Sequence, residues 1–219
     1  MRWFLDMCII LYSAGEGDRP DLNKKTKKFI EEKGVNTFLT CYYIKERDLP
    51  KYLERQKIIL DEIIKKINDD SYTLYNSQKS YKLTNRDKKK LIKLLLLSKT
   101  INKAEDRIKS IMNLFSELER RINSFLQNYI DEFVVPVGEI DQELRSHLMS
   151  FINIGKSNKN YSDTCILASA IQENNNKQLI IITADKNDWN KELLQEVYNH
   201  YNLKKKYPKL PDINYLQDL

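Results

Sequence analysis

The chain has 219 residues, of which 41% are hydrophobic and 31% charged, a size that fits one domain with a substantial insertion. It contains no run of about 18 uncharged apolar residues, and Asp6 interrupts the apolar start, so it predicts neither a membrane span nor a signal peptide. The cysteines Cys8, Cys41 and Cys165 are too far apart for a disulfide framework or a structural zinc site. We expect a cytoplasmic protein with no membrane partner, and interpret the cysteines as small side chains beside a site.

The net charge of +6 is concentrated in the middle of the chain. Residues 51–131 hold 18 Lys and Arg residues against 11 Asp and Glu residues, whereas the remainder holds 19 against 20. Such asymmetry favours a polyanionic partner for the middle segment, and the alternative is an ordinary solvated helical surface.

The first segment reads as alternating strands and helices. An apolar run, "WFLDMCIILY", predicts a first strand that ends near Asp6. Residues 21–32 predict a helix, with Gly34 as its stop, and residues 35–40 predict a short second strand.

The middle segment reads as helices throughout. Apolar residues recur at helical spacing from Leu53 to Ile67, and Thr84 with Asp87 forms a capping pattern before the next helix. Between residues 101 and 129 the apolar steps alternate between three and four, which is typical of a coiled-coil seam. We expect this helix to pack within the same chain, as a helical hairpin or small bundle; the alternative is a homodimer.

The last segment returns to alternation. Residues 133–137 predict a short strand in which Pro136 marks an edge or the strand's end, and a helix follows over residues 139–152. Residues 160–172 predict a second helix, with Ser162 as N-cap, and the unbroken apolar run at 178–183 predicts a strand buried on both faces. The sequence therefore predicts an α/β fold with a mostly parallel central sheet flanked by helices. Its core would be residues 1–49 and 132–219, with an all-helical insertion at 50–131.

Acidic residues stand where this sheet would end. Asp6 and Asp185 follow predicted strands, Glu46 lies on the helix after the second strand, and Asp163 opens a helix. The carboxyl ends of parallel strands gather ligands, and clustered carboxylates repel one another unless a cation lies among them. An all-oxygen cluster suits Mg²⁺ or Mn²⁺. Taken singly, Asp163 also fits a helix-dipole residue and Asp185 a turn residue.

Four motifs together resemble the PIN-domain nucleases. They are "FLDMCIILYSA", "TCYYIKE", "YSDTCILASAI" and "IIITADKNDW", and they cover roughly residues 1–49 and 132–189. The resemblance implies that Asp6, Glu46, Asp163 and Asp185 bind the metal and act in catalysis. It also implies that Thr183 orients a carboxylate or water and that Asp188 binds a second ion or supports the first.

Two features depart from the family pattern. Cys8 stands where the family often has Asn, and Glu31, Glu32 and Glu54 are rivals of Glu46. Other α/β classes fit less well, because a dehalogenase-type phosphatase needs D-x-D and a Rossmann nucleotide binder needs G-x-G-x-x-G.

The resemblance implies metal-dependent hydrolysis of phosphodiesters, most often by an endoribonuclease. Divalent ions lower the pKa of a bound water and stabilise charge that develops on phosphate. The alternative is a PIN-like module that binds RNA or a protein through its long heptad helix without cutting. Small family members act as toxins of toxin–antitoxin pairs, but an antitoxin partner is not derivable from this chain.

The basic insertion supplies candidates for holding RNA, with DNA as the alternative. A nucleic-acid partner needs positive charge outside an acidic pocket. Tyr72, Tyr75 and Tyr81 interleave with Lys79 and Lys82, which predicts either base stacking or an ordinary loop. The basic candidates are Arg86, Lys88, Lys89, Lys90, Lys93, Arg120 and Arg121.

Overall fold

The computed structural model describes residues 2–16, 19–34, 37–152, 161–186 and 189–219. The chain divides into two compact units, which we call the sheet unit (residues 1–49 and 122–219) and the helical unit (residues 50–121). The helical unit ends earlier than the insertion expected at 50–131. In the described part of the chain, no helix is both long and apolar enough to cross a bilayer.

The sheet unit is built on five parallel strands, which confirms the α/β fold. In spatial order they are β3 (Ile130–Val134), β2 (Phe38–Cys41), β1 (Arg2–Leu5), β4 (Leu179–Thr183) and β5 (Asp212–Tyr215). From β1 the chain moves outward through β2 to β3, and then returns to place β4 on the other side of β1. The winding direction therefore reverses between β1 and β4, and such a switch point opens a crevice at the carboxyl ends of the strands.

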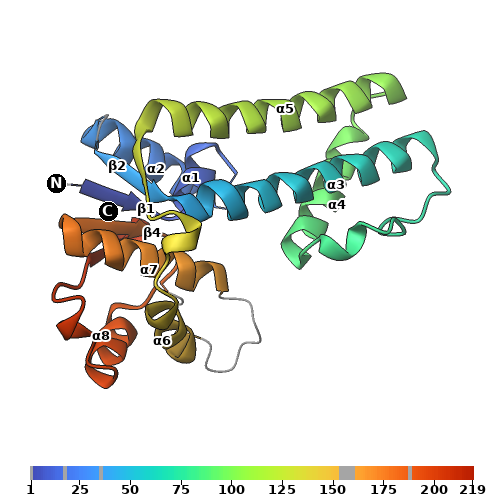
Figure 1. Ribbon diagram of the computed structural model, residues 1–219. Helices are drawn as coiled ribbons and strands as arrows, with labels where there is room; N and C mark the ends of the chain where they lie inside the picture. Colours follow the sequence, from blue (N-terminus) through green and yellow to red (C-terminus); the bar gives the residue numbers. More distant parts are fainter. Residues whose placement is uncertain (1, 17–18, 35–36, 153–160, 187–188) are drawn as a thin grey trace. The chain divides into compact units, whose positions relative to one another are not determined.

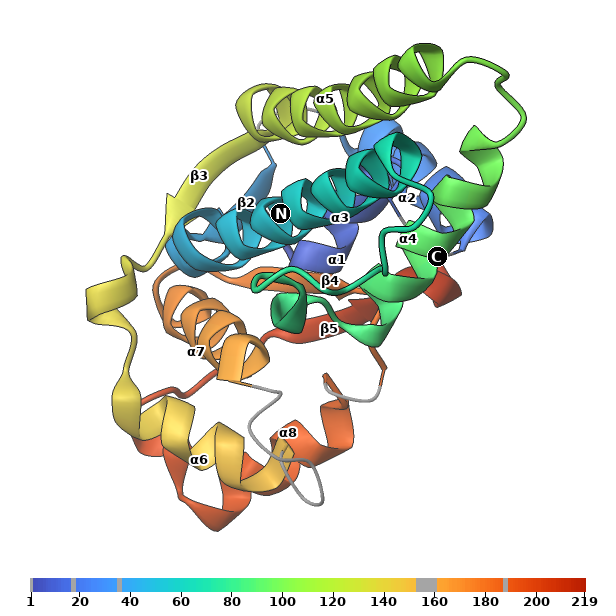
Figure 2. The same ribbon diagram turned by 90° about the vertical axis from the view of Figure 1, so that its right-hand side faces the viewer.

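Helices cover both faces of the sheet (Figures 1 and 2). α1 (Met7–Ser13) and α2 (Pro20–Lys33) lie on one face, and α7 (Tyr161–Asn176) lies on the other. α6 (Gln142–Ile152) packs on α7, and α8 (Lys191–His200) packs on α6. This two-sided cover explains why β4 is almost wholly buried, as its unbroken apolar run predicted.

Short helical turns fill the connections of the sheet unit. They are η1 (Ile44–Asp48), a π-helix, and the 3₁₀ turns η3 (Val137–Glu139), η4 (Leu203–Lys205) and η5 (Leu216–Asp218). Gly34 ends α2 with φ of 73°, which confirms the predicted stop because this conformation strains residues that carry a Cβ.

Two predictions need correction, and one strand was missed. The third strand begins at Ile130 rather than Phe133 and stops before Val135, whose φ of 51° turns the chain away from the sheet. Ser162 is not an N-cap, because α7 has already begun at Tyr161. The strand β5 was not predicted at all.

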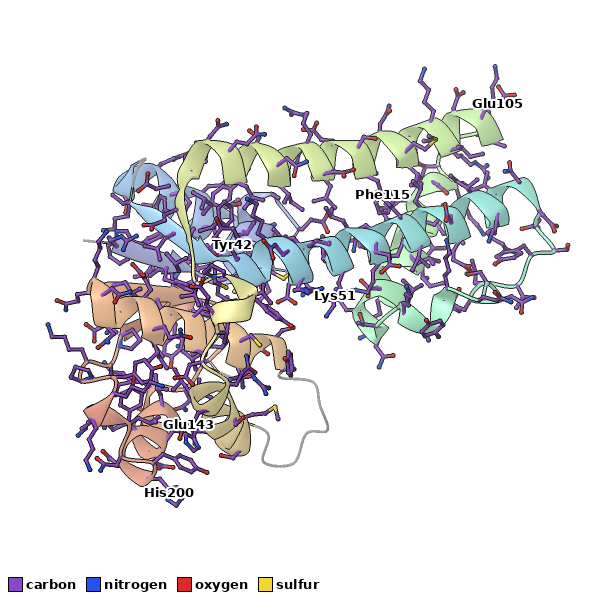
Figure 3. All side chains as sticks on the ribbon, viewed as in Figure 1. Tyr42, Lys51, Glu105, Phe115, Glu143 and His200 are labelled. Atoms are coloured by element: carbon purple, nitrogen blue, oxygen red, sulfur yellow. The ribbon has the colours of Figure 1, made fainter. Side chains whose placement is uncertain are left out.

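The helical unit has its own apolar core. It contains residues 50–68 of α3 (Leu49–Asn68), η2 (Ser80–Lys82), α4 (Asn85–Ser98) and residues 104–121 of α5 (Ala104–Tyr129). Its buried core residues are Ile58, Ile59, Ile63, Leu83, Leu91 and Ile111. Phe115 packs against them from the side of α5 that faces the other helices (Figure 3). Within this unit, the seam of α5 therefore packs in the same chain, as expected.

The start of α4 forms the predicted capping box. The Thr84 hydroxyl accepts from the Asp87 amide, and the Asp87 carboxylate accepts from the Thr84 amide at 2.9 Å. Arg55 of α3 adds an ion pair of 3.0 Å to the same carboxylate. The capping box thus fixes where α4 begins, and the ion pair with Arg55 joins that end of α4 to α3.

A buried glutamate holds the loop between α3 and α4. Glu62 is fully buried and accepts from the Tyr75 amide at 2.6 Å, the Ser80 hydroxyl at 3.0 Å and the Tyr72 hydroxyl at 3.1 Å. Burial alone would raise the pKa of Glu62, but the hydrogen bonds outweigh it and lower that pKa below its usual value. Tyr72 and Tyr75 are therefore parts of the fold, whereas Tyr81 is 81% exposed.

We predict that Glu62→Ala destabilises the chain by about 1–3 kcal/mol, because it leaves buried donors without an acceptor. A carboxylate whose pKa is lowered on folding contributes stability above its unfolded pKa and loses it as the pH falls through the folded pKa. The variant should therefore lose part of the parent's stability at neutral pH and show a smaller further loss on acidification. Urea unfolding at several pH values measures both effects.

The matched control is Glu54→Ala, which removes a carboxylate of the same helix from an exposed ion pair with Lys82. Exposed pairs contribute about 0–1 kcal/mol, so this variant should stay close to the parent. Equal losses in the two variants would contradict the role given to Glu62.

Candidate functional site

Asp6 lies at the switch point of the sheet. Leu5 of β1 pairs with Ile182 of β4, and the Asp6 amide donates to the Ile182 carbonyl at 3.1 Å. This register brings Asp6 to Thr183, the last residue of β4, whose hydroxyl donates to Asp6 Oδ2 at 2.8 Å. The same hydroxyl accepts from the Asp185 amide at 3.0 Å. Asp6, Thr183 and Asp185, all predicted site residues, therefore form one connected group.

Cys8 belongs to the same group. Its thiol donates to Asp6 Oδ2 at 3.0 Å, and its sulfur accepts from the Ala184 amide at 3.2 Å. Burial, together with the charge of Asp6, raises the pKa of the Cys8 thiol well above its usual value, so Cys8 stays protonated and is no nucleophile.

The Asp6 carboxylate is held in an unfavourable place for a charge. It is only 5% exposed, and burial raises its pKa; the hydrogen bonds from Cys8, Thr183 and the Met7 amide lower it, and the charge of Asp185 raises it. Asp185 is thus close enough for the two carboxylates to repel each other.

A second group of polar residues lies between η1 and α7. The Ser162 hydroxyl donates to the buried Asp48 carboxylate at 2.8 Å, next to Asp163 in the first turn of α7. Glu46, on the same π-helix, is exposed. Asp48 was not among the predicted site residues. Its spacing of four from the buried Ile44 is the signal that would have pointed to it, because that spacing puts both residues on one helix face.

α7 runs back along the sheet before β4 begins, and it packs on β2 and β4 (Figure 2). Its first turn, with Asp163, therefore lies toward the carboxyl ends of the strands, where Asp6 also lies. Over residues 2–16, 19–34, 37–152, 161–186 and 189–219, however, no group of three or more His, Cys, Asp and Glu side chains is close enough to hold a metal ion. Asp188 lies outside the described residues.

The donor set at the switch point fits a hard cation. Mg²⁺ takes oxygen ligands, keeps several waters, and is commonly held by one or two carboxylates together with substrate phosphates. Asp6 and Asp185 supply such a pair of carboxylates, and their mutual repulsion is the electrostatic condition that a cation relieves. A closed cage of protein ligands is not required for this ion.

The predicted basic residues differ in how they are engaged. Arg120 and Arg121 both pair with Glu117, at 2.8 and 2.9 Å, and Lys90 donates to Gln56 at 2.7 Å. Lys88 lies over the Tyr75 ring, 5.3 Å from its centroid. Arg86, Lys89 and Lys93 are exposed on α4.

Comparison of the chain with protein-family models, curated proteins and solved structures finds no significant match.

We predict that Asp6→Asn raises thermal stability at neutral pH in buffer with EDTA. A carboxyl whose pKa is raised on folding contributes stability below its unfolded pKa, and that stability is lost as the pH rises through the folded pKa. The amide carries no charge, and the Cys8 thiol and Thr183 hydroxyl can also accept hydrogen bonds. Each kcal/mol gained should raise Tm by about 2–4 °C.

Thermal unfolding at acidic and neutral pH measures this effect, with Asp131→Asn as control because Asp131 is exposed on β3. The gain of Asp6→Asn should shrink toward acidic pH. A variant less stable than the parent at neutral pH would contradict the burial cost assigned to Asp6.

Proposed function

We propose that this protein is a metal-dependent nuclease that hydrolyses phosphodiester bonds in RNA, with a PIN-like sheet unit. One observation carries the proposal: at the switch point of a parallel sheet, the Thr183 hydroxyl donates to the Asp6 carboxylate and accepts from the Asp185 amide, which brings the two acidic residues together. No serine, histidine or cysteine nucleophile lies among the described contacts of this group, since the thiol of Cys8 is a hydrogen-bond donor with a raised pKa.

In this proposal the bound Mg²⁺ or Mn²⁺ supplies an acidified water and charge stabilisation at the scissile phosphate. Asp6, Asp163 and Asp185 hold the ion, Thr183 orients the Asp6 carboxylate, and Asp188 supports the set. Glu46 keeps the role that the family pattern gives it. Asp48 is a further candidate acid, because it is buried and bonded beside Asp163.

The helical unit is proposed to hold the RNA backbone. It carries the excess positive charge of the chain, and Lys89 and Lys93 are exposed on α4. Arg120 and Arg121 contribute less, because Glu117 already balances part of their charge.

The test is incubation of the full chain with single-stranded and structured RNA and Mg²⁺ or Mn²⁺. We expect cleavage by the parent and a loss of at least about 100-fold in the Asp6→Asn/Asp163→Asn variant, since metal catalysis supplies several kcal/mol and about 1.4 kcal/mol is tenfold in rate. EDTA should abolish cleavage in the parent. RNA binding without cleavage, across metals and substrates, would overturn the enzyme proposal.

That outcome would favour a non-catalytic binding module as the alternative. One observation supports this second candidate: α4 exposes the aliphatic side chains of Ile92, Leu96 and Leu97, beside Lys89 and Lys93. Aliphatic surface of this kind is not needed for holding phosphates and fits a protein partner better.

A separate prediction concerns the salt dependence of RNA binding. The slope of log K against log salt is negative, and each lost phosphate contact on single-stranded nucleic acid makes it shallower by about 0.7. Lys89→Gln/Lys93→Gln should therefore weaken binding to poly(U) and make this negative slope shallower by about 1.4. Fluorescence anisotropy at several salt concentrations measures both quantities.

Lys24→Gln/Lys27→Gln removes the same charge from exposed positions of α2 and serves as control. An equal change of slope in both variants would mean that net charge, rather than the α4 surface, governs binding.

A further inference from the structure

The hydrogen bonds of Asp6 leave one acceptor position open. A carboxylate offers about four lone-pair sites on its two oxygens. Within the described part of the chain, Oδ2 accepts from both Cys8, at 3.0 Å, and Thr183, at 2.8 Å, whereas Oδ1 accepts from the Met7 amide alone, at 2.6 Å. The remaining site is therefore on Oδ1.

Cys8 does more than fill space beside this carboxylate. Its thiol donates a hydrogen bond to Asp6, after β1, and its sulfur accepts one from the Ala184 amide, after β4. A side chain that both donates and accepts is needed to join the two strand ends in this way. Asn, which the resembling family often has at this position, also carries a donor and an acceptor, whereas an aliphatic residue of similar size has neither.

We propose that Cys8 is a positioning residue: with Thr183 it fixes Asp6 Oδ2, so that Asp6 offers a metal ion a single lone pair on Oδ1. This inference rests on the proposed function, because it assigns a role toward the ion that the proposal requires. Asp6 then acts as a monodentate ligand of fixed orientation. Loss of either donor lets the carboxylate rotate and weakens the site without removing any ligand.

The experiment measures Mn²⁺ affinity by titration calorimetry on the full chain. Loss of a hydrogen-bond partner behind a metal ligand typically lowers metal affinity by about 10–100-fold. We expect that loss for Cys8→Ala and a change of only a few-fold for Cys8→Ser, whose hydroxyl both donates and accepts. Cys41→Ala removes a buried thiol of β2 and should leave the affinity unchanged.

A double-variant cycle with Thr183→Ala tests whether both residues act on the same oxygen. Independent effects would multiply. Loss of either donor already frees the Asp6 carboxylate. The double variant Cys8→Ala/Thr183→Ala should therefore bind Mn²⁺ almost as well as whichever single variant has the lower Mn²⁺ affinity.

Two readouts separate positioning from a general loss of structure. Thermal unfolding in EDTA should show Cys8→Ala still folded. Hydrogen exchange of the Ala184 amide should speed up in Cys8→Ala and be restored in Cys8→Ser, because that amide donates to the side chain of residue 8.

The outcomes are distinguishable. A parent chain that binds no Mn²⁺ overturns the proposed function and this inference together. A parent that binds Mn²⁺ while Cys8→Ala binds equally well, or while the effects of Cys8 and Thr183 multiply, overturns this inference alone and leaves the proposed function standing.

Discussion

A charged residue stands at each end of the central strand β1, and the two differ in whether an opposite charge lies beside them. At its start, Arg2 pairs with Glu173 at 2.6 Å and also with Glu132, so opposite charges balance across neighbouring elements. At its end, the donors that Asp6 meets among the described residues are neutral: a thiol, a hydroxyl and a backbone amide. Neutral donors orient a carboxylate but leave its charge in place. The charge at the start of β1 is thus paired, whereas the acid at the switch point lies beside neutral donors. Such an arrangement favours a cation at the switch point.

Glu62 of the helical unit shows what a purely structural buried acid looks like in this chain. Its carboxylate accepts from two hydroxyls and an amide of the loop that it organises, and the net effect is a lowered pKa. Asp6 also has three donors, yet its pKa is raised, because burial is joined by the charge of Asp185. At Asp6 burial is the largest cause, the hydrogen bonds do not outweigh it as they do at Glu62, and the charge of Asp185 adds to it; a cost of this kind marks a candidate functional site.

The parts of the fold that could be predicted from sequence are those set by local chemistry. Neighbouring residues alone predict three such features: the capping box of Thr84 and Asp87, the helix end at Gly34, and the buried strand β4. β5 could not be found, because it is four residues long, begins with Asp212 and depends on β4 for its pairing. The start of β3 was hidden because the helical periodicity of α5 runs directly into Ile130. For the site, Asp6 and Asp185 followed from strand ends, and Thr183 followed from the family resemblance. Asp48 did not, because its spacing from Ile44 marks a helix face but not its partner Ser162, which is 114 residues away in the chain.

An incomplete set of protein ligands has a consequence for the proposed nuclease. A cation held by the carboxylates of Asp6, Asp163 and Asp185 would keep open positions for waters or substrate phosphates. RNA would then contribute ligands of its own, so metal and RNA would each raise the affinity for the other by the same factor. The exposed lysines of α4 fit this scheme, since they attract the backbone without supplying any ligand. Under the proposed function, the sheet unit thus supplies an oriented charge and the substrate completes the centre, which makes catalysis depend on the phosphodiester being present.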